Sequence, residues 1–119
     1  MLIRYKKSYE KIAMGLLSFV PSEKDLKKLR QTMKTYEEQK DWQLFLWKEE
    51  DIIGIIGIKL QENKAELHHV SVNPSYRGQG IGKKMIISLH QFLGDEYTIV
   101  PTRQVYDFYK NCIKKNESV

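Results

Sequence analysis

The feature that most constrains the fold of this chain is a glycine-rich loop between a strand-like segment and a helix-like segment. Glycines stand at positions 78, 80 and 82, soon after the apolar stretch 70–72. Glycine permits tight turns and leaves successive backbone N–H groups free to point at a ligand. Beyond the loop, apolar residues recur at helical spacing: Ile81, Met85, Leu89, Phe92 and Leu93. The pattern therefore predicts a loop that leads into the N-terminus of an amphipathic helix.

This loop predicts an anion-binding site. The first turn of a helix carries unpaired N–H groups and the positive end of the helix dipole, and both attract phosphate. Arg77, Lys83 and Lys84 add full positive charges beside the loop. A phosphate or pyrophosphate group is the ligand that these features favour. The alternative is a glycine-rich helix start without a ligand.

Two familiar phosphate-binding loops do not match these residues. A Walker A loop needs glycine where this chain has Arg77, and serine or threonine where it has Lys84. A dinucleotide-binding fingerprint needs a third glycine where this chain has Lys83. Both types of nucleotide site are therefore excluded.

Length and composition favour one small soluble domain spanning residues 1–119. The net charge of +5 suits an acidic ligand, but the lysines are scattered and form no arm of the kind that binds nucleic acid. Cys112 is the only cysteine, which excludes an intramolecular disulfide and a cysteine-rich zinc site, and no metal is expected. The apolar stretch 12–20 is shorter than the roughly 20 residues of a membrane span, and we interpret it as a buried helix.

The hydrophobic pattern predicts a mixed α/β fold without internal repeats. Strand-like and helix-like segments alternate in the order β-α-α-β-β-β-α-β-α. The second helix is expected to open with the capping-box-like pattern Ser22-x-x-Asp25. The predicted strands are 2–6, 43–48, 52–60, 65–72 and 97–100, and the predicted helices are 8–20, 22–36, 81–93 and 102–115.

The loop also carries a more specific motif. Arg77-x-x-Gly80-x-Gly82 follows the strand Val70-x-Val72-x-Pro74. This combination resembles motif A of the Gcn5-related N-acetyltransferases, the GNAT family, and the order of elements is also that of the GNAT fold. The resemblance implies that the loop holds the pyrophosphate of acetyl-CoA and that the strand before it pairs with the pantetheine arm. The implied cofactor-binding residues are Val70, Ser71, Val72, Arg77, Gly78, Gln79, Gly80, Ile81, Gly82 and Lys83.

The resemblance implies an enzyme that moves an acetyl group from acetyl-CoA to a primary amine by direct attack. Acetyl-CoA would be a co-substrate drawn from the cytoplasmic pool, so we expect a cytoplasmic protein that does not bind membranes. The alternative is a catalytically silent regulator that binds acyl-CoA. It is motivated by the chain ending at Val119, where most relatives continue with two further strands.

Two residues of the predicted strand 65–72 are candidates for the base that takes a proton from the amine. Glu66 lies eleven residues before Arg77, the spacing at which some GNAT members carry a catalytic glutamate. His68 also suits a base that acts through water. Strict strand alternation places Glu66, His68, Val70 and Val72 on one face, and Leu67, His69 and Ser71 on the other. Glu66 as a solvated strand residue, and either histidine as a packing residue, remain open alternatives.

The GNAT resemblance also implies an acid for the leaving thiolate. It is a tyrosine in the helix after the fifth strand, and Phe108-Tyr109 matches it, with Tyr106 as a substitute. The chain departs from the GNAT pattern around this tyrosine. It has Thr102 where the family usually has asparagine, and Ile113-Lys114 where the family usually has Gly-Phe. Simple packing of the helix on the sheet is the alternative reading.

Two wider expectations concern partners. The edge of the last predicted strand would be bare, and proteins cover such edges, so a homodimer that covers it is expected. The stretches 1–8, 11–19 and 44–48 resemble a small GNAT-like protein encoded in riboflavin-biosynthesis operons of Bacillus-type bacteria, which implies a link to riboflavin metabolism.

Overall fold

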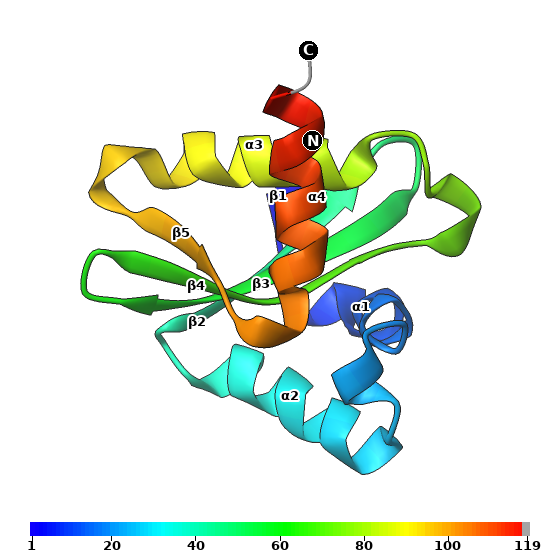
Figure 1. Ribbon diagram of the computed structural model, residues 1–119. Coiled ribbons are helices and arrows are strands. Elements are labelled where there is room, and N and C mark those ends of the chain that lie inside the picture. Colours follow the sequence, from blue (N-terminus) through cyan, green and yellow to red (C-terminus); the bar gives the residue numbers. More distant parts are fainter. Residues whose placement is uncertain (118–119) are drawn as a thin grey trace.

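The computed structural model describes the backbone of residues 1–117 and the side chains of residues 1–112. A five-stranded sheet separates two pairs of helices (Figure 1). The predicted order of elements and the mixed α/β fold are confirmed. The strands are β1 (Leu2–Arg4), β2 (Trp42–Lys48), β3 (Ile52–Gln61), β4 (Lys64–Val72) and β5 (Thr98–Pro101), and the helices are α1 (Glu10–Leu17), α2 (Leu26–Glu38), α3 (Ile81–Leu93) and α4 (Tyr106–Glu117).

Each face of the sheet carries its own hydrophobic core. One core joins α3 and α4 to the sheet, and Met85 and Leu89 are fully buried in it. The other joins α1 and α2 to the opposite face, with Leu17 and Leu46 fully buried. Helix packing on both faces is the reason that β3 reads as a nearly continuous apolar run rather than as an alternating one.

The second helix begins later than predicted. Its N-cap is Asp25, whose carboxylate accepts a hydrogen bond from the backbone N–H of Lys27 at 3.3 Å. Ser22 belongs to the preceding turn, Pro21–Glu23, so the expected capping box does not form. This turn instead buries Glu23 beneath α2, with only 1% of the residue exposed.

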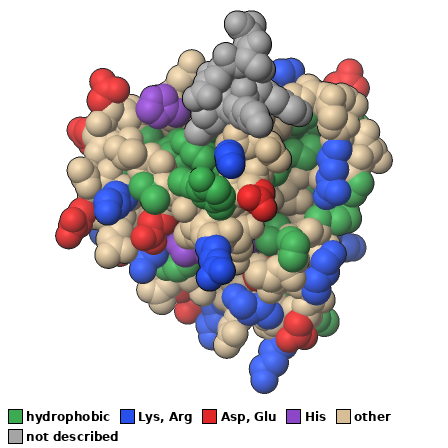
Figure 2. All heavy atoms as spheres, in the orientation of Figure 1, with side chains coloured by type: hydrophobic (Ala, Val, Ile, Leu, Met, Phe, Trp, Pro, Cys, Tyr) green, Lys and Arg blue, Asp and Glu red, His purple; other side chains and the backbone are tan. Residues whose placement is uncertain are grey.

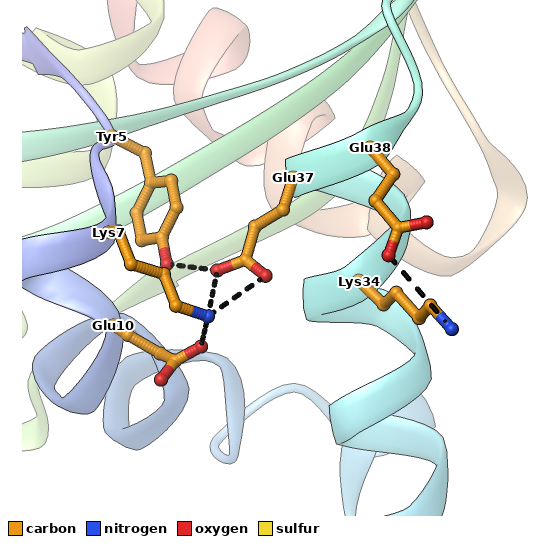
Figure 3. Close-up of polar contacts among 6 residues, drawn as sticks. All are labelled: Tyr5, Lys7, Glu10, Lys34, Glu37 and Glu38. Carbon is orange, nitrogen blue, oxygen red and sulfur yellow. Dashed lines mark hydrogen bonds and ion pairs between the residues drawn. The ribbon is translucent and has the colours of Figure 1, made fainter.

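An ion-pair cluster ties the N-terminal segment to the end of α2 (Figure 3). The Tyr5 hydroxyl donates to a Glu37 carboxylate oxygen at 2.6 Å, and the Lys7 ammonium lies 3.2 Å from the same oxygen. Burial acts to raise the pKa of Glu37, but the hydrogen bonds from Tyr5 and Lys7 outweigh it and lower that pKa. The cluster also includes Glu10 at the start of α1, so it joins the first ten residues to the distant end of α2.

The strand β4 has two features that shape the site. It pairs with β5 only through residues 64–67, so residues 68–72 have no strand partner on that side. It also contains a β-bulge: Gly57 pairs with His69 and Ile58 with Leu67, so His68 has no opposite residue on β3.

The bulge contradicts the strict alternation expected for β4. Leu67, Val70 and Val72 pack in the core under α3, so Val70 and Val72 do not share a face with His68. His68 and His69 instead both face the α2 side, where they contact Trp42 and Tyr36. The physical reason is the extra residue in the bulge, which shifts the alternation by one position.

Candidate functional site

The glycine-rich loop has the conformation that its sequence predicts. After the turn Pro74–Tyr76, the backbone φ angles of Gly78 and Gly80 are +82° and +75°, values that favour glycine over residues with a side chain. Gly80 is the N-cap of α3, which begins at Ile81. The loop therefore delivers the free N–H groups of a helix start to one point.

A third glycine of the loop allows α4 to approach α3. A Cβ atom at Gly82 would overlap the ring of Phe108, with Cε1 only 3.1 Å away. Close packing of Phe108 on Gly82 places the side of α4 beside the loop. The glycines of this motif therefore have different physical roles, two in the backbone conformation and one in packing.

A cavity of about 440 Å³ lies between this loop, β4, α4 and the segment that follows α1. All the residues predicted to bind the cofactor line it, except Gln79. Phe19, Val20 and Pro21 form part of its apolar wall, and Phe108, Asn111 and Cys112 of α4 form another. The cavity thus has the glycine-rich loop with Arg77 and Lys83 in one part of its lining and mostly apolar side chains in another.

Arg77 has a structural contact as well as a charge. Its Nε donates to the backbone carbonyl of Val72 at 3.1 Å, and its guanidinium carbon lies 5.8 Å from the centre of the Phe19 ring. These contacts fix the loop to the end of β4. Lys83 lines the cavity, whereas its neighbour Lys84 is exposed and does not.

The cavity fits an elongated ligand with a phosphate-rich end. The helix start, Arg77 and Lys83 would meet the phosphates, and the unpaired side of β4 offers backbone groups to an extended arm. The hydroxyl of Ser71 on this stretch is buried and lacks a hydrogen-bond partner among the described residues. Unmet polar groups beside a cavity are what a polar ligand arm would satisfy.

The two predicted base candidates lie together on the α2 side of β4. Nε2 of His68 is 3.4 Å from a carboxylate oxygen of Glu66, and their side chains are 23% and 32% exposed. The His68 ring packs against Trp42 with 4.5 Å between ring centres. Both groups are therefore close to each other and accessible to a ligand.

A buried polar cluster next to them was not predicted. The Tyr36 hydroxyl lies 2.6 Å from Nδ1 of His69, and Nε2 of His69 lies 3.8 Å from a carboxylate oxygen of Glu23. Thr32 and Ser22 donate hydrogen bonds to the two oxygens of that carboxylate, and the Lys28 ammonium lies 3.6 Å from it. One carboxylate, one imidazole and one phenol therefore form a chain across the face of the sheet.

Burial controls the protonation of this cluster. It lowers the pKa of His69 to about 4, although the nearby Glu23 carboxylate acts in the opposite direction. Burial, followed by the charge of Glu23, raises the pKa of Tyr36 well above its ordinary value. At neutral pH His69 is therefore a neutral imidazole and Tyr36 a neutral phenol.

A second cavity, of about 360 Å³, adjoins this cluster on the α2 side. The two histidines at 68 and 69 line it, whereas the next three residues of β4 line the larger cavity. The side chain of Gln104 also lines it and donates a hydrogen bond to the carbonyl of His68. The two cavities are thus lined by consecutive residues of one strand.

Tyr109 does not join these residues. It lines a separate hollow between α3 and α4, with Lys83, Ile86 and Ile99, and is absent from the lining of the larger cavity. Burial raises the pKa of its phenol. Its substitute Tyr106 is half exposed. The role expected for Tyr109 stays a prediction, and Phe108 is the residue of this pair that lines the large cavity.

Two kinds of site find no support in the described residues. No group of three or more histidine, cysteine, aspartate or glutamate side chains is placed to hold a metal ion within that part of the chain. None of the helices that the structure describes is long and apolar enough to cross a membrane.

Comparison with known proteins gives a consistent result. The model of the acetyltransferase (GNAT) family matches residues 13–112. An uncharacterized N-acetyltransferase in the lysA 3′ region of Bacillus methanolicus is 59% identical over 114 residues, which cover 94% of each chain.

Solved structures share the fold. AAC(6′)-Iy, in complex with the bisubstrate analogue CoA-S-monomethyl-acetylneamine, has a TM-score of 0.76 at 12% identity, and the match covers 98% of this chain and 87% of the other. The glucosamine-6-phosphate N-acetyltransferase of Arabidopsis thaliana has a TM-score of 0.62 at 16% identity, with 94% and 88% covered.

Proposed function

Since this chain belongs to the acetyltransferase (GNAT) family, we propose that it transfers the acetyl group of acetyl-CoA to a primary amine by direct attack. The observation that carries the proposal is the 440 Å³ cavity, which the loop and the unpaired half of β4 line together. The loop from Arg77 to Lys83 holds the pyrophosphate in this proposal, and the backbone of residues 70–72 holds the pantetheine arm.

Acetyl-CoA supplies an activated acetyl thioester to this site. The protein must then orient the amine, polarise the thioester carbonyl and accept a proton from nitrogen. We assign the polarising donor to a backbone N–H near Val70, where β4 has no partner strand. Glu66 and His68 are the first candidates to receive the proton, because they are adjacent and accessible.

We propose that the acceptor amine binds in the 360 Å³ cavity beside His68 and His69, the acceptor cavity. Lys28 is the only residue with a full charge among the described residues that line it. Lysine and arginine side chains also gather in the lower part of Figure 2, around α2. A polycation such as neamine is therefore disfavoured here, and an amine with a neutral or anionic remainder is favoured.

Acetyl-CoA binding is tested by thermal shift, because a ligand that binds only the folded state raises apparent stability. Lys83→Ala and Lys84→Ala form a matched pair, since only Lys83 lines the cavity. We expect about tenfold weaker binding for Lys83→Ala, which corresponds to one charge-assisted contact, and little change for Lys84→Ala. Equal affinities for the two variants would argue against the assigned pyrophosphate site.

Acetyl transfer is tested by thiol release with a panel of amines. Glucosamine 6-phosphate represents anionic acceptors, and neamine represents polycationic acceptors. A lysine peptide represents acceptors that carry charges of both signs. Amine-containing precursors of riboflavin belong in the panel because they test the link to riboflavin metabolism that we expect from the sequence. We expect the anionic or neutral amines to react faster, and a preference for neamine would contradict the proposed acceptor cavity.

A catalytically silent, acyl-CoA-binding regulator is the second candidate. The position of Tyr109 outside the large cavity favours it, since the acid expected for the leaving thiolate is not beside the site. Acetyl-CoA binding without thiol release from any amine would support the regulator. With either function we also propose a homodimer that covers the outer edge of β5. A monomer in sedimentation equilibrium at micromolar concentration would argue against this homodimer.

A further inference from the structure

The cluster of Glu23, His69 and Tyr36 is not used by the chemistry proposed above. Its three side chains come from three different elements: the turn before α2, the strand β4, and α2 itself. The exposed fractions of the three residues are 1%, 5% and 7%. The cluster nevertheless borders the acceptor cavity, because Tyr36 and His69 both line it.

We assign one tautomer to His69 from its two polar contacts. Tyr36 is a neutral phenol, so its O–H donates to Nδ1 of His69 at 2.6 Å. The neutral imidazole then carries its hydrogen on Nε2, which faces the Glu23 carboxylate at 3.8 Å. This tautomer makes one hydrogen bond, with Tyr36, and leaves the Nε2 hydrogen near the Glu23 carboxylate, which lies beyond hydrogen-bond distance.

The sheet is shaped to admit this arrangement. Gly57 lies opposite His69 on β3, and a Cβ atom there would overlap the Tyr36 hydroxyl and lie 2.5 Å from Cζ of the same ring. The bulge at His68 turns His69 towards α2 rather than into the core under α3. The glycine at position 57 and the bulge at His68 thus both make room for the contact between Tyr36 and His69.

We propose that Tyr36, His69 and Glu23 form a proton relay that ends at the acceptor cavity, with the Tyr36 hydroxyl meeting the amine directly or through one water. This proposal rests on the proposed acetyl transfer, and it makes Tyr36, in place of Glu66 or His68, the group that receives the amine proton. Tyr36 would be the group that contacts the substrate, whereas His69 and Glu23 would act through it. The chain Ser–His–Asp of hydrolases works by the same physical logic, in which a carboxylate stabilises the imidazolium that forms.

The proposed step moves one proton from the amine nitrogen to the leaving sulfur. The amine nitrogen forms its bond to the acetyl carbon, and the carbon–sulfur bond breaks with its electron pair on sulfur. The amine gives one proton to the Tyr36 oxygen as the Tyr36 proton passes to Nδ1 of His69, and Glu23 stabilises the resulting imidazolium. The same proton returns through Tyr36 to the leaving sulfur, so the three side chains end in their starting states.

A purely structural role explains the cluster less well. A buried carboxylate with polar partners is seldom more stabilising than apolar side chains of the same volume. Clusters of perturbed ionisable groups beside a cavity are instead typical of functional sites. The groups that face His69 are Glu23, Tyr36 and Lys28 from the α2 side and His68 from its own strand.

The test compares two tyrosine hydroxyls, one carried by α2 and bonded to β4, the other carried by the N-terminal segment and bonded to α2. Tyr36→Phe removes the relay hydroxyl, and Tyr5→Phe, the matched control, removes a hydroxyl bonded to Glu37 at the surface. With the most reactive amine of the panel, we expect Tyr36→Phe to lower kcat about 100-fold, the size typical of lost acid–base catalysis, with the acetyl-CoA Kd unchanged. Glu23→Gln should lower kcat about tenfold, and Tyr5→Phe should leave it within a factor of two.

A second measurement does not depend on activity. Nitrogen NMR of the histidine rings should show His69 with hydrogen on Nε2 at pH 7, and Tyr36→Phe should shift its Nδ1 signal. If the protein is active and Tyr36→Phe keeps kcat within threefold of the unmodified protein, the relay is overturned and the proposed acetyl transfer stands. If no amine reacts, the proposed transfer fails instead, and hydrogen on Nδ1 of His69 would then overturn the relay as well.

Discussion

Gly57 is the residue through which the buried cluster is most directly tested. In Gly57→Ala the new methyl group would overlap the Tyr36 hydroxyl and lie 2.5 Å from Cζ, so the Tyr36 ring has to move. Moving it breaks the Tyr36–His69 hydrogen bond, which costs about 1–3 kcal/mol for buried groups left unpaired. Overpacking adds about 1–3 kcal/mol, and replacing glycine in a strand returns about 0.5–1 kcal/mol.

The expected net loss for Gly57→Ala is therefore about 3 kcal/mol of unfolding free energy, measured by urea denaturation. A melting temperature roughly 10 °C lower should accompany it in a chain of this size. Acetyl-CoA affinity should change little, because Gly57 does not line the large cavity.

Gly15→Ala is the matched control for this experiment. Gly15 lies exposed in α1, and nothing is within 4 Å of the position of its added Cβ. Alanine is the better helix former there, so a gain of about 0.5–1 kcal/mol is expected. Equal stability of Gly57→Ala and Gly15→Ala would refute the packing of Tyr36 on the sheet. Partial recovery in Gly57→Ala combined with Tyr36→Phe would identify the hydroxyl as the obstructing atom.

Three further predictions concern charge and backbone. Lowering the pH from 6.5, the ordinary pKa of histidine, to about 4 should destabilise the protein, because only the unfolded chain protonates His69 in this range. The free energy of unfolding, measured in urea at pH 7 and 4.5, should fall less in His69→Gln. Glu37→Gln should remove a stabilisation that is present above the ordinary glutamate pKa and is lost as the pH falls through the lowered pKa of Glu37. In 1 M salt the melting temperatures of Glu37→Gln and the unmodified protein should lie closer together. Gly80→Ala should cost about 1–2 kcal/mol by thermal unfolding and weaken acetyl-CoA binding, since only the positive φ resists the methyl group.

The glycine loop and the order of elements were predictable because they depend on local rules. Left-handed φ at Gly78 and Gly80 follows from which residues tolerate that conformation, and helix and strand periods are visible within single segments. The share of the large cavity's lining that the loop supplies followed from the same rules, whereas the share supplied by Phe19 and Phe108 depends on how distant elements pack.

The position of His69 was not predictable from alternation. A bulge at His68 inserts one residue into β4, and nothing within the strand's own sequence announces it. Glu23 was missed for a related reason. A glutamate in a polar turn is expected in water, and its burial depends on Thr32, Lys28 and His69 arriving from other elements.

Local sequence thus specified the backbone conformation of the loop that we propose binds the pyrophosphate, because glycine conformation and helix termini need no distant partner. The assembly of the sheet selected which side chains meet behind β4, because a single extra residue in one strand changes the face that every later side chain occupies. The glycine-rich loop is visible in the sequence alone. Tyr36, His69 and Glu23 become one cluster only when α2 packs across the bulged strand.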